Sequence, residues 1–164
     1  LGQGMSTATG AALGNKLDGR DSHVFVFVGD GECDEGQVWE AAQFAAHYKL
    51  DNLVCFVDSN KRQLDGAVED IMSHGKGLRA KFDAFGWNAI ELEDGNDVEQ
   101  IYDAVQEAYA TKGQPTAIIL NTIKGKGATF AESTGAHSSQ PTPEQWEEAI
   151  AAAEAELAAV KAAK

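Results

Sequence analysis

The sequence predicts an α/β fold: a doubly wound, mainly parallel sheet with helices on both faces. The first observation behind this prediction is that short apolar runs alternate with longer segments of helical periodicity along the 164 residues. The second is that most of these runs, such as HVFVFV at 23–28 and LVCFV at 53–57, are continuously apolar. Parallel strands covered on both faces have this composition, whereas strands with one exposed face alternate between apolar and polar residues.

The amino-terminal segment 4–17 is rich in small residues and predicts a closely packed helix. Its buried face is expected to hold Met5, Ala8, Ala12 and Leu17. In the rest of the chain, β-branched and aromatic runs predict strands, helical periodicity predicts helices, and aperiodic segments rich in turn residues predict loops. The expected strands are 23–28, 53–57, 87–92 and 116–122; the further helices are 35–50, 77–85, 96–112 and 141–164; and the main loops are 60–69 and 123–140.

Capping residues indicate where two of these helices begin. Asn96 with Glu99 three residues later forms a capping box, in which each side chain bonds the backbone of the other residue. Thr142 as N-cap, Pro143 at the first helical position and Gln145 at the third predict the start of the last helix.

Composition narrows the kind of protein and the classes of partner. A chain of 164 residues, 43% of them hydrophobic and without an evident linker, is expected to form a single domain over 1–164. A net charge of −13 argues against nucleic acid or an anionic membrane as a partner. No apolar run reaches the roughly 18 residues that a membrane span needs. Cys33 and Cys55 match no zinc or CxxC pattern, which predicts a reduced, cytoplasmic protein.

Two polar side chains lie just past the ends of consecutive predicted strands. Asp30 follows the first apolar run within Gly29-Asp30-Gly31, and Asn60 follows the second run. Ligands of open α/β sheets bind beyond the carboxyl ends of the strands. A carboxylate and an amide oxygen suit Mg²⁺, or Ca²⁺ or Mn²⁺, that also binds phosphate, and the two glycines let the backbone approach an anion closely. The alternative is an ordinary strand-to-helix turn, which favours Gly and Asp for its backbone angles.

Several motifs together resemble the amino-terminal, thiamine diphosphate-binding part of transketolases. GDG followed after nearly thirty residues by Asn is similar to the signature of thiamine diphosphate enzymes in general. The closer resemblance covers nearly the whole chain. It is carried by LGQGMSTATGAALG at 1–14, GDGECDEGQVWEAAQFAAHYKLDNL at 29–53, NKRQLDG at 60–66, FGWNAIELEDGND at 85–97 and IKGKG at 123–127.

The resemblance implies which residues bind the metal and the diphosphate. Asp30 and Asn60 match the two side chains that bind the metal in the family, and the backbone carbonyl of Arg62 matches a third ligand. Gly31 matches a residue whose amide contacts the diphosphate, with Gly29 beside it in the same turn.

The resemblance also implies residues around the reacting part of the cofactor. Leu1 and Leu64 match positions that border or pack on thiamine diphosphate. Glu35 matches an acid at the subunit contact that helps a partner glutamate to protonate the aminopyrimidine; a helix-dipole role for a first-turn glutamate is the alternative. His137 matches a catalytic histidine against the diphosphate and the reacting centre, although AHSSQP departs from the usual His-Gly followed by Ala-Pro or Lys-Ala-Pro. The other histidines are expected to be structural or to lie in a loop without a clear role: His23, His47 and His74.

The function that the resemblance implies is that of a transketolase of the pentose phosphate pathway, which depends on thiamine diphosphate and magnesium. Such an enzyme moves a two-carbon ketol unit from a ketose phosphate to an aldose phosphate. Family histidines that act on the substrate belong before Leu1, where we expect further residues, and the pyrimidine-binding domain has no counterpart before Lys164. We therefore expect a split transketolase. Its partner would be a carboxy-terminal, pyrimidine-binding subunit, in a heterotetramer with two copies of each chain.

Two other functions remain open. The chain could belong to another thiamine diphosphate enzyme, such as a deoxyxylulose-phosphate synthase or a transketolase-like enzyme of sugar catabolism. It could also be a non-catalytic paralogue that keeps the fold and has lost the upstream histidines. Turnover of xylulose 5-phosphate with ribose 5-phosphate, or of pyruvate instead, distinguishes the enzymatic alternatives.

Overall fold

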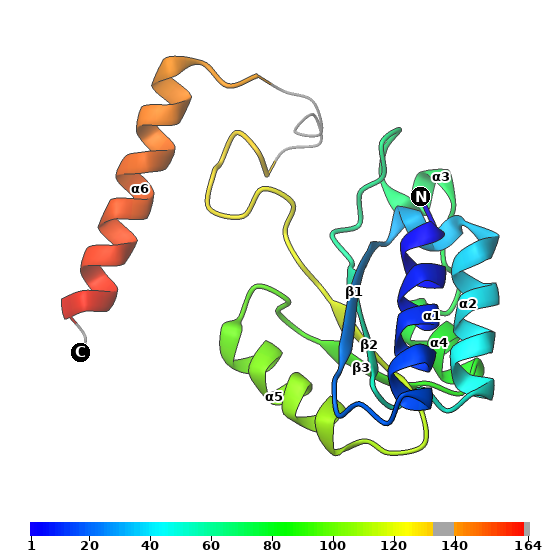
Figure 1. Cartoon of the computed structure of the whole chain (residues 1–164). Helices are drawn as coiled ribbons and strands as arrows, with labels where there is room; N and C mark the ends of the chain where they lie inside the picture. The colour runs from blue at the N-terminus through cyan, green and yellow to red at the C-terminus, as the bar shows by residue number, and fades with distance from the viewer. Residues whose placement is uncertain (133–139, 163–164) are drawn as a thin grey trace. The chain divides into compact units, whose positions relative to one another are not determined.

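A computed structural model describes residues 1–132 and 140–162 of the chain, which divides into two compact units (Figure 1). The unit Leu1–Thr122 contains all four strands, and the unit Ile123–Lys164 contains the last helix, α6 (Pro143–Ala162). None of the helices in the described part of the chain is both long and apolar enough to cross a bilayer. A single domain over the whole chain stays a prediction.

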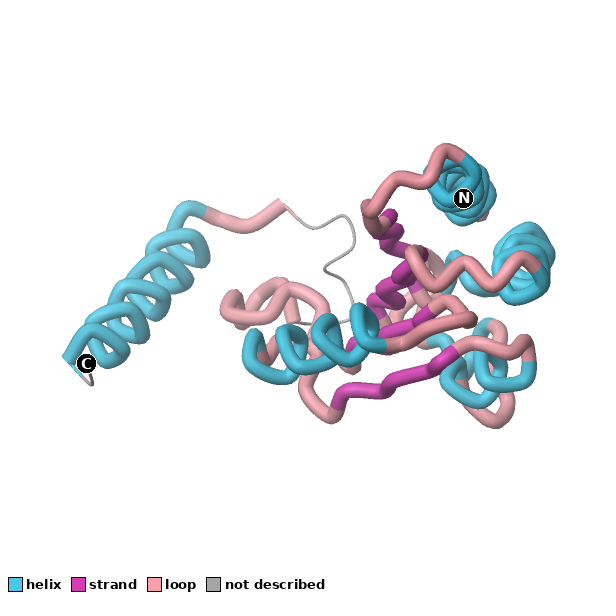
Figure 2. The backbone as a smooth tube through the Cα atoms, turned by 60° about the horizontal axis from the view of Figure 1, so that its bottom comes forward, coloured by secondary structure: helices cyan, strands magenta, loops and turns pink. Residues whose placement is uncertain are grey.

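The first unit is built on a sheet of four parallel strands (Figure 2). The strands are β1 (Val24–Gly29), β2 (Leu53–Asp58), β3 (Asn88–Leu92) and β4 (Thr116–Leu120). Their order in the sheet is β1-β2-β4-β3, which confirms the predicted parallel α/β architecture. Gly29 pairs with Asp58, and Asp58 pairs with Leu120, so three strands end side by side. The loops that follow these strands share one edge of the sheet.

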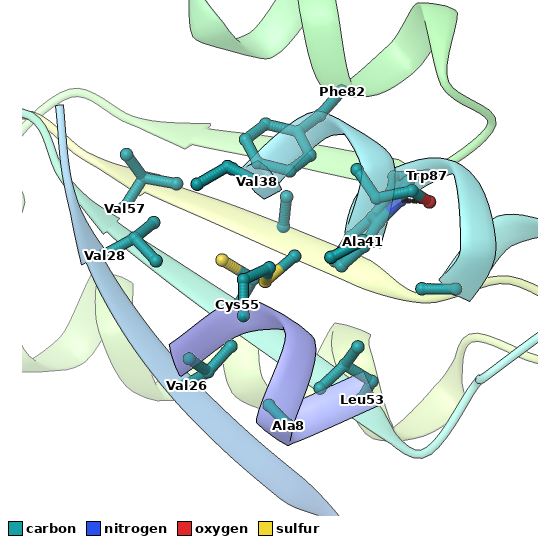
Figure 3. Close-up of a cluster of buried hydrophobic side chains, with 14 of the residues drawn as sticks. Ala8, Val26, Val28, Val38, Ala41, Leu53, Cys55, Val57, Phe82 and Trp87 are labelled. Carbon is teal, nitrogen blue, oxygen red and sulfur yellow. Dashed lines mark hydrogen bonds between the residues drawn. The ribbon is translucent and has the colours of Figure 1, made fainter. Parts of the chain in front are cut away.

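One face of the sheet is covered by three helices that pack with it into the larger core (Figure 3). They are α1 (Gln3–Leu17), α2 (Gly36–His47) and α4 (Leu78–Ala84). The expected face of α1 is confirmed for Met5, Ala8 and Ala12, which are buried. Leu17 was wrongly assigned to that face and is 79% exposed. Five positions separate it from Ala12, which turns its side chain about 140° around the helix.

The opposite face of the sheet carries the helix α5 (Val98–Ala110). Its buried alanines Ala104 and Ala108 pack in a second core with Val54 and Ile118 of the central strands. Helices therefore lie on both faces, as predicted from the continuous apolar runs.

The edge strand β1 departs from the expected burial on both faces. Phe25 is 43% and Phe27 67% exposed, because β1 lies at one edge of the sheet while α5 packs near β3 at the other. The ring of Phe27 stacks on Phe56 of β2 at a centroid distance of 4.7 Å. A continuous apolar run can thus alternate between buried and exposed positions when it forms an edge strand.

Most helix and strand ends lie within a few residues of those predicted, and the caps explain one difference. The N-cap of α5 is Asp97, whose Oδ1 accepts hydrogen bonds from the backbone N–H of Glu99 (2.9 Å) and Gln100 (3.4 Å). The predicted cap at Asn96 is wrong by one residue. Two short helices were not predicted: the 3-10 helix η1 (Gly31–Asp34) and α3 (Val68–Ile71).

The start of α6 agrees with the predicted capping pattern. The backbone N–H of Thr142 donates to Oε1 of Gln145 at 2.9 Å, and the N–H of Gln145 donates to Oγ1 of Thr142 at 3.3 Å. This reciprocal pair satisfies two backbone donors at the beginning of the helix.

Candidate functional site

Asp30 directly follows β1 and is only 2% exposed to solvent. As the N-cap of η1, it accepts a hydrogen bond on Oδ1 from the backbone N–H of Gly31 at 2.8 Å. Its Oδ2 accepts another from the backbone N–H of Lys61 at 2.6 Å, in the loop after β2. The carboxylate thereby joins the loops that follow two neighbouring strands.

The negative charge of Asp30 is poorly compensated by the described residues. Burial raises the pKa of Asp30, and hydrogen bonds from Gly31 and Lys61 offset this only in part, while the Asp58 carboxylate raises it further. No ion pair within 1–132 and 140–162 involves Asp30. A cation bound here would relieve both the desolvation and the repulsion between carboxylates.

Asn60 lies in the loop after β2, and hydrogen bonds orient both ends of its side chain. Its Oδ1 accepts from the backbone N–H of Arg62 at 2.9 Å, and its Nδ2 donates to Oδ2 of Asp58 at 3.0 Å. The hydroxyl of Thr122, just after β4, donates to the other oxygen of Asp58. An amide oxygen has two lone pairs, so Oδ1 of Asn60 can still coordinate a cation.

Lys61 is a site residue that sequence reasoning missed. Its φ of 64° lies in the left-handed region, which is uncommon for a residue with a side chain. Its backbone N–H is bound to Asp30, while its Nζ donates to Oγ of Ser59 at 2.7 Å and to Oδ1 of Asn121 at 2.8 Å. Lys61 therefore ties together residues that follow β1, β2 and β4. No sequence signal marks it, because lysine is not a residue that favours positive φ.

Glu32 connects the turn after β1 to the amino end of the chain. Its Oε1 accepts from the backbone N–H of Gly2 at 2.8 Å, and its Oε2 accepts from the N–H of Gly29 at 3.3 Å. Gly2 has a φ of 76° and approaches Glu35 closely, since an added Cβ would lie 3.1 Å from the Cβ of Glu35. The segment that begins with Leu1 is thus held against the turn.

Three of the predicted site residues lie on the surface of the described chain. Leu1 is 85% and Leu64 73% exposed, and Glu35 is exposed at the N-cap of α2. Their roles toward a cofactor or a second subunit stay predictions. His137 lies outside the described residues, so its predicted role is untested as well.

A polar pocket of about 80 Å³ adjoins Asp30. Its polar lining comprises Asp30, Ser59, Lys61, Glu69, His74 and Glu91. The side chain of His74 is 9% exposed; its Nδ1 lies 3.6 Å from Oδ1 of Asp34 and 3.4 Å from Nζ of Lys81. Burial lowers the pKa of His74, with Lys81 acting in the same direction. The segment around His74 looked like a plain loop in the sequence, and only the fold brings it to Asp30.

The oxygen atoms at the strand ends suit a metal ion that is bound jointly by the protein and a ligand, rather than one enclosed by protein side chains alone. Within the described ranges, no group of three or more His, Cys, Asp or Glu side chains could enclose a metal ion. The carboxylate of Asp30 and the amide oxygen of Asn60 would provide only part of a coordination shell for a metal ion. Mg²⁺ is commonly bound in this way, with phosphate oxygens and water completing the octahedron.

Comparison with known proteins assigns the family. The model of the transketolase thiamine diphosphate binding domain matches residues 1–156. The chain belongs to this family. The resemblance to transketolases, and with it the thiamine diphosphate-binding type of domain, is therefore confirmed.

Two curated relatives of this transketolase domain are named as transketolase subunits. The chain is 44% identical over 157 residues to the 6-deoxy-6-sulfo-D-fructose transketolase subunit SqwG of Clostridium sp. (strain MSTE9), covering 95% of this chain and 56% of the relative. It is 39% identical over 151 residues to an apulose-4-phosphate transketolase subunit of Phocaeicola vulgatus, covering 92% and 53%. The chain thus spans about half the length of these relatives.

Solved transketolase structures share the fold. The transketolase of Campylobacter jejuni matches with a TM-score of 0.84 and 29% identity, over 91% of this chain and 24% of that one. A mutant transketolase from Pichia stipitis matches with a TM-score of 0.81 and 31% identity, over 88% and 23%. These similarities confirm the α/β fold of a transketolase domain.

Proposed function

We propose that the chain is the thiamine diphosphate- and magnesium-binding subunit of a two-chain transketolase, which transfers a two-carbon ketol unit from a ketose phosphate to an aldose phosphate. The observation that carries the proposal is the buried carboxylate of Asp30. It accepts a hydrogen bond from the backbone N–H of Lys61, the residue that follows Asn60 in the sequence. Oxygen ligands at adjacent strand ends fit a hard divalent cation that also binds a diphosphate.

Each residue of the site has a proposed task. Asp30, Asn60 and the backbone carbonyl of Arg62 would hold the metal. Gly31 would contact the diphosphate through an amide that also donates to Asp30, and Gly29 leaves room beside it. When bound, thiamine diphosphate supplies the carbanion stabilisation that transfer of a carbon unit requires. The protein's task is to position the cofactor and to control its protonation.

The remaining site residues would act around the reacting end of the cofactor. Leu1 and Leu64 offer apolar side chains with 85% and 73% of their surface available for packing. Glu35 is exposed beside Gly2, as suits an acid that meets a partner subunit. His137 is proposed to contact the diphosphate and the substrate.

The proposed partner is a carboxy-terminal transketolase subunit that carries the pyrimidine-binding half, in a heterotetramer with two copies of each chain. The support is that two relatives are named as transketolase subunits. If half the pocket lies on another chain, the isolated chain should bind thiamine diphosphate feebly. Tight binding measured by calorimetry for the chain alone would contradict the shared site.

A second candidate is a transketolase of sugar catabolism rather than of the pentose phosphate pathway. It is favoured by the names of the same two relatives. One is named as a transketolase subunit for 6-deoxy-6-sulfo-D-fructose, and the other as one for apulose 4-phosphate. The metal and cofactor sites would be unchanged, and the donor sugar would differ.

The decisive experiment is a donor comparison with the enzyme assembled from this chain and the subunit that co-purifies with it. Ribose 5-phosphate serves as a common acceptor, and xylulose 5-phosphate, 6-deoxy-6-sulfo-D-fructose and apulose 4-phosphate serve as donors. Turnover that requires both Mg²⁺ and thiamine diphosphate is expected with at least one donor. The proposal fails if no ketose is turned over, or if pyruvate is the substrate instead.

A further inference from the structure

We propose that Asp34 and Gln63 form a clamp that holds the two metal-binding loops in register before the cation arrives. This inference rests on the proposed metal site. Nε2 of Gln63 donates a hydrogen bond of 2.8 Å to Oδ2 of Asp34. Asp34 ends η1, four residues after Asp30, and Gln63 lies three residues after Asn60. The bond therefore connects the same two loops that the Lys61 amide connects.

The side chain of Gln63 is fixed by packing as well as by its hydrogen bond. It passes so close over Gly31 that an added Cβ on this glycine would lie 2.9 Å from Cγ of Gln63. The backbone N–H of Gln63 donates to the carbonyl of Gly66 at 2.8 Å, which closes the turn of the second loop. The aliphatic stem of Gln63 thus lies on the turn that carries Asp30, and its amide reaches past the turn to Asp34.

Asp34 is placed to act as the centre of this arrangement. Its side chain is 18% exposed, and the oxygen that Gln63 does not use lies 3.6 Å from Nδ1 of the buried His74. A hydrogen bond to a carboxylate that is largely removed from water is stronger than one between neutral surface groups. Asp34 therefore links three segments that are far apart in the sequence.

The clamp bears on metal binding because the cation needs ligands from both loops at once. Asp30 and Asn60 are contributed by separate loops, and ordering those loops at the moment of binding would weaken the affinity. Gln63 and Asp34 are positioning residues in this account: they keep the ligands at a fixed separation without touching the metal.

The first test removes the clamp without changing charge. Gln63→Met keeps the length and apolar stem of the side chain and loses the donor. In the assembled enzyme with saturating thiamine diphosphate, we expect the Kd for Mg²⁺ to rise about tenfold. The kcat at saturating Mg²⁺ should be retained, since only the alignment of the ligands is affected. An unchanged Kd, or a lowered kcat at every Mg²⁺ concentration with an unchanged Kd, overturns the clamp.

The chain offers a matched control for this variant. Nε2 of Gln100 donates to Oδ2 of Asp97 at 3.0 Å, which is the same type of bond at the start of α5. Gln100→Met should leave the Kd for Mg²⁺ unchanged. A rise equal to that of Gln63→Met would mean that any such loss weakens metal binding, and the clamp would be rejected.

The second test sets the clamp against simple electrostatics. Gln63→Glu adds a negative charge near the cation, so charge alone predicts tighter Mg²⁺ binding. The clamp predicts weaker binding, because two carboxylates then face each other across the loops. Adding Asp34→Asn to Gln63→Glu restores a donor and an acceptor with the original net charge, and we expect it to recover the affinity. Binding by Gln63→Glu as tight as the wild type, or no recovery in the double variant, contradicts the proposal.

A third measurement does not depend on the metal. In the full chain without Mg²⁺, hydrogen exchange at the amides of Gly31 and Lys61 should be faster in Gln63→Met than in the wild type. Unchanged exchange rates argue against the clamp even if the Kd rises. Should the wild-type enzyme bind neither Mg²⁺ nor thiamine diphosphate, the proposed function fails, while exchange in the apo chain still decides on the clamp.

Discussion

The backbone amide of Lys61 lies 2.6 Å from Oδ2 of Asp30 and joins the loops after β1 and β2. Lys61 makes this bond from a left-handed backbone conformation, with a φ of 64°. It explains how the buried carboxylate is held in one orientation. The same contact brings the residue next to Asn60 against Asp30, and it is the geometric basis on which a metal site shared by two strand ends is proposed.

The first prediction concerns the charged metal ligand. Asp30→Asn removes the charge from the proposed site, and we expect the affinity of the assembled enzyme for Mg²⁺ to fall roughly a hundredfold or more. Calorimetric titration in the presence of thiamine diphosphate measures the change. Asp65→Asn, at an exposed position of the neighbouring loop, removes the same charge and serves as the control. Equal Kd values for wild type and Asp30→Asn would refute the metal assignment.

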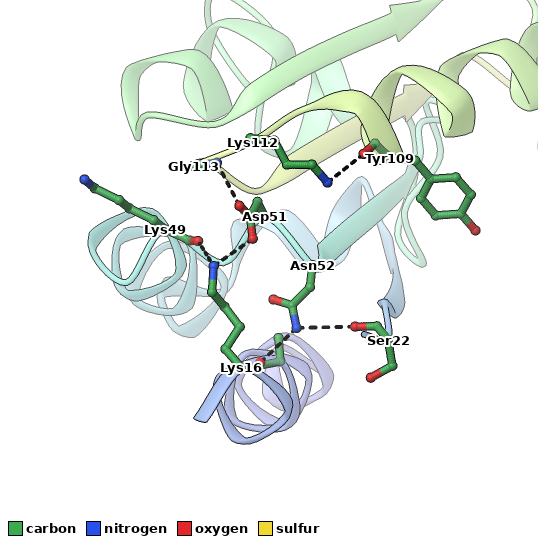
Figure 4. A network of polar contacts seen from close by, with 9 residues as sticks. Lys16, Ser22, Lys49, Asp51, Asn52, Tyr109, Lys112 and Gly113 are labelled. Carbon is green, nitrogen blue, oxygen red and sulfur yellow. Dashed lines mark hydrogen bonds and ion pairs between the residues drawn. The ribbon is translucent and has the colours of Figure 1, made fainter. Parts of the chain in front are cut away.

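The second prediction is a dependence of stability on pH that arises at Asp51 (Figure 4). Its Oδ1 pairs with Nζ of Lys16 at 2.7 Å, and its Oδ2 accepts from the backbone N–H of Gly113 at 2.9 Å. Burial raises the pKa of Asp51, but the contacts with Lys16, Gly113 and Lys112 together lower it below its ordinary value. A depressed carboxyl pKa contributes stability above the unfolded pKa, and this stability is lost as the pH falls through the folded pKa.

We therefore expect Asp51→Asn to reduce the free energy of unfolding by about 1 kcal/mol at neutral pH. The difference from the wild type should vanish in acid, below the depressed pKa. Urea denaturation across the pH range measures both. Asp18→Asn is the control. The side chains of Asp18 and Arg20, which form an ion pair, are 60% and 67% exposed, so the pair should contribute little to stability. A difference for Asp51→Asn that persists unchanged in acid would contradict the assignment.

The third prediction concerns the reactivity of Cys33. Burial raises the pKa of its thiol and, together with the nearby carboxylates of Asp30 and Glu32, brings it to about 12. Since the thiolate is the reactive form, Cys33 should resist iodoacetamide in the folded chain at about pH 8 and react once the chain unfolds. Mass spectrometry of the labelled protein reports this. Alkylation of native Cys33 at the rate of a free thiol would show that the turn after β1 opens.

The fourth prediction tests which residue caps α5. Asp97→Ala should lower the free energy of unfolding, because the helix loses two side-chain hydrogen bonds to its first turn. Asn96→Ala should cost less, since it leaves that cap in place. Thermal or urea denaturation compares the two variants. A larger loss of stability in Asn96→Ala than in Asp97→Ala would mean that Asn96, the cap expected from the sequence, is the N-cap of α5.

Local patterns were sufficient to predict the parallel α/β architecture and the meeting of two loops at one sheet edge. Strands can be recognised from continuous runs of β-branched and aromatic residues, and polar residues that follow such runs lie where open sheets bind ligands. Asp30 and Asn60 were found in this way, and the pairing of β1 with β2 confirms that their loops are neighbours. The reciprocal cap of Thr142 and Gln145 is equally local.

Only the tertiary structure decided which segments distant along the chain contact one another. The side chains of Gln63 and His74 meet Asp34 only because the loops after β1 and β2 and the segment before α4 converge. The exposure of Phe27 follows from the place of β1 at the sheet edge, which no run of residues encodes. The physical reason is that periodicity and capping depend on neighbours a few residues away. Strand order and loop contacts depend instead on how the whole chain buries its apolar faces.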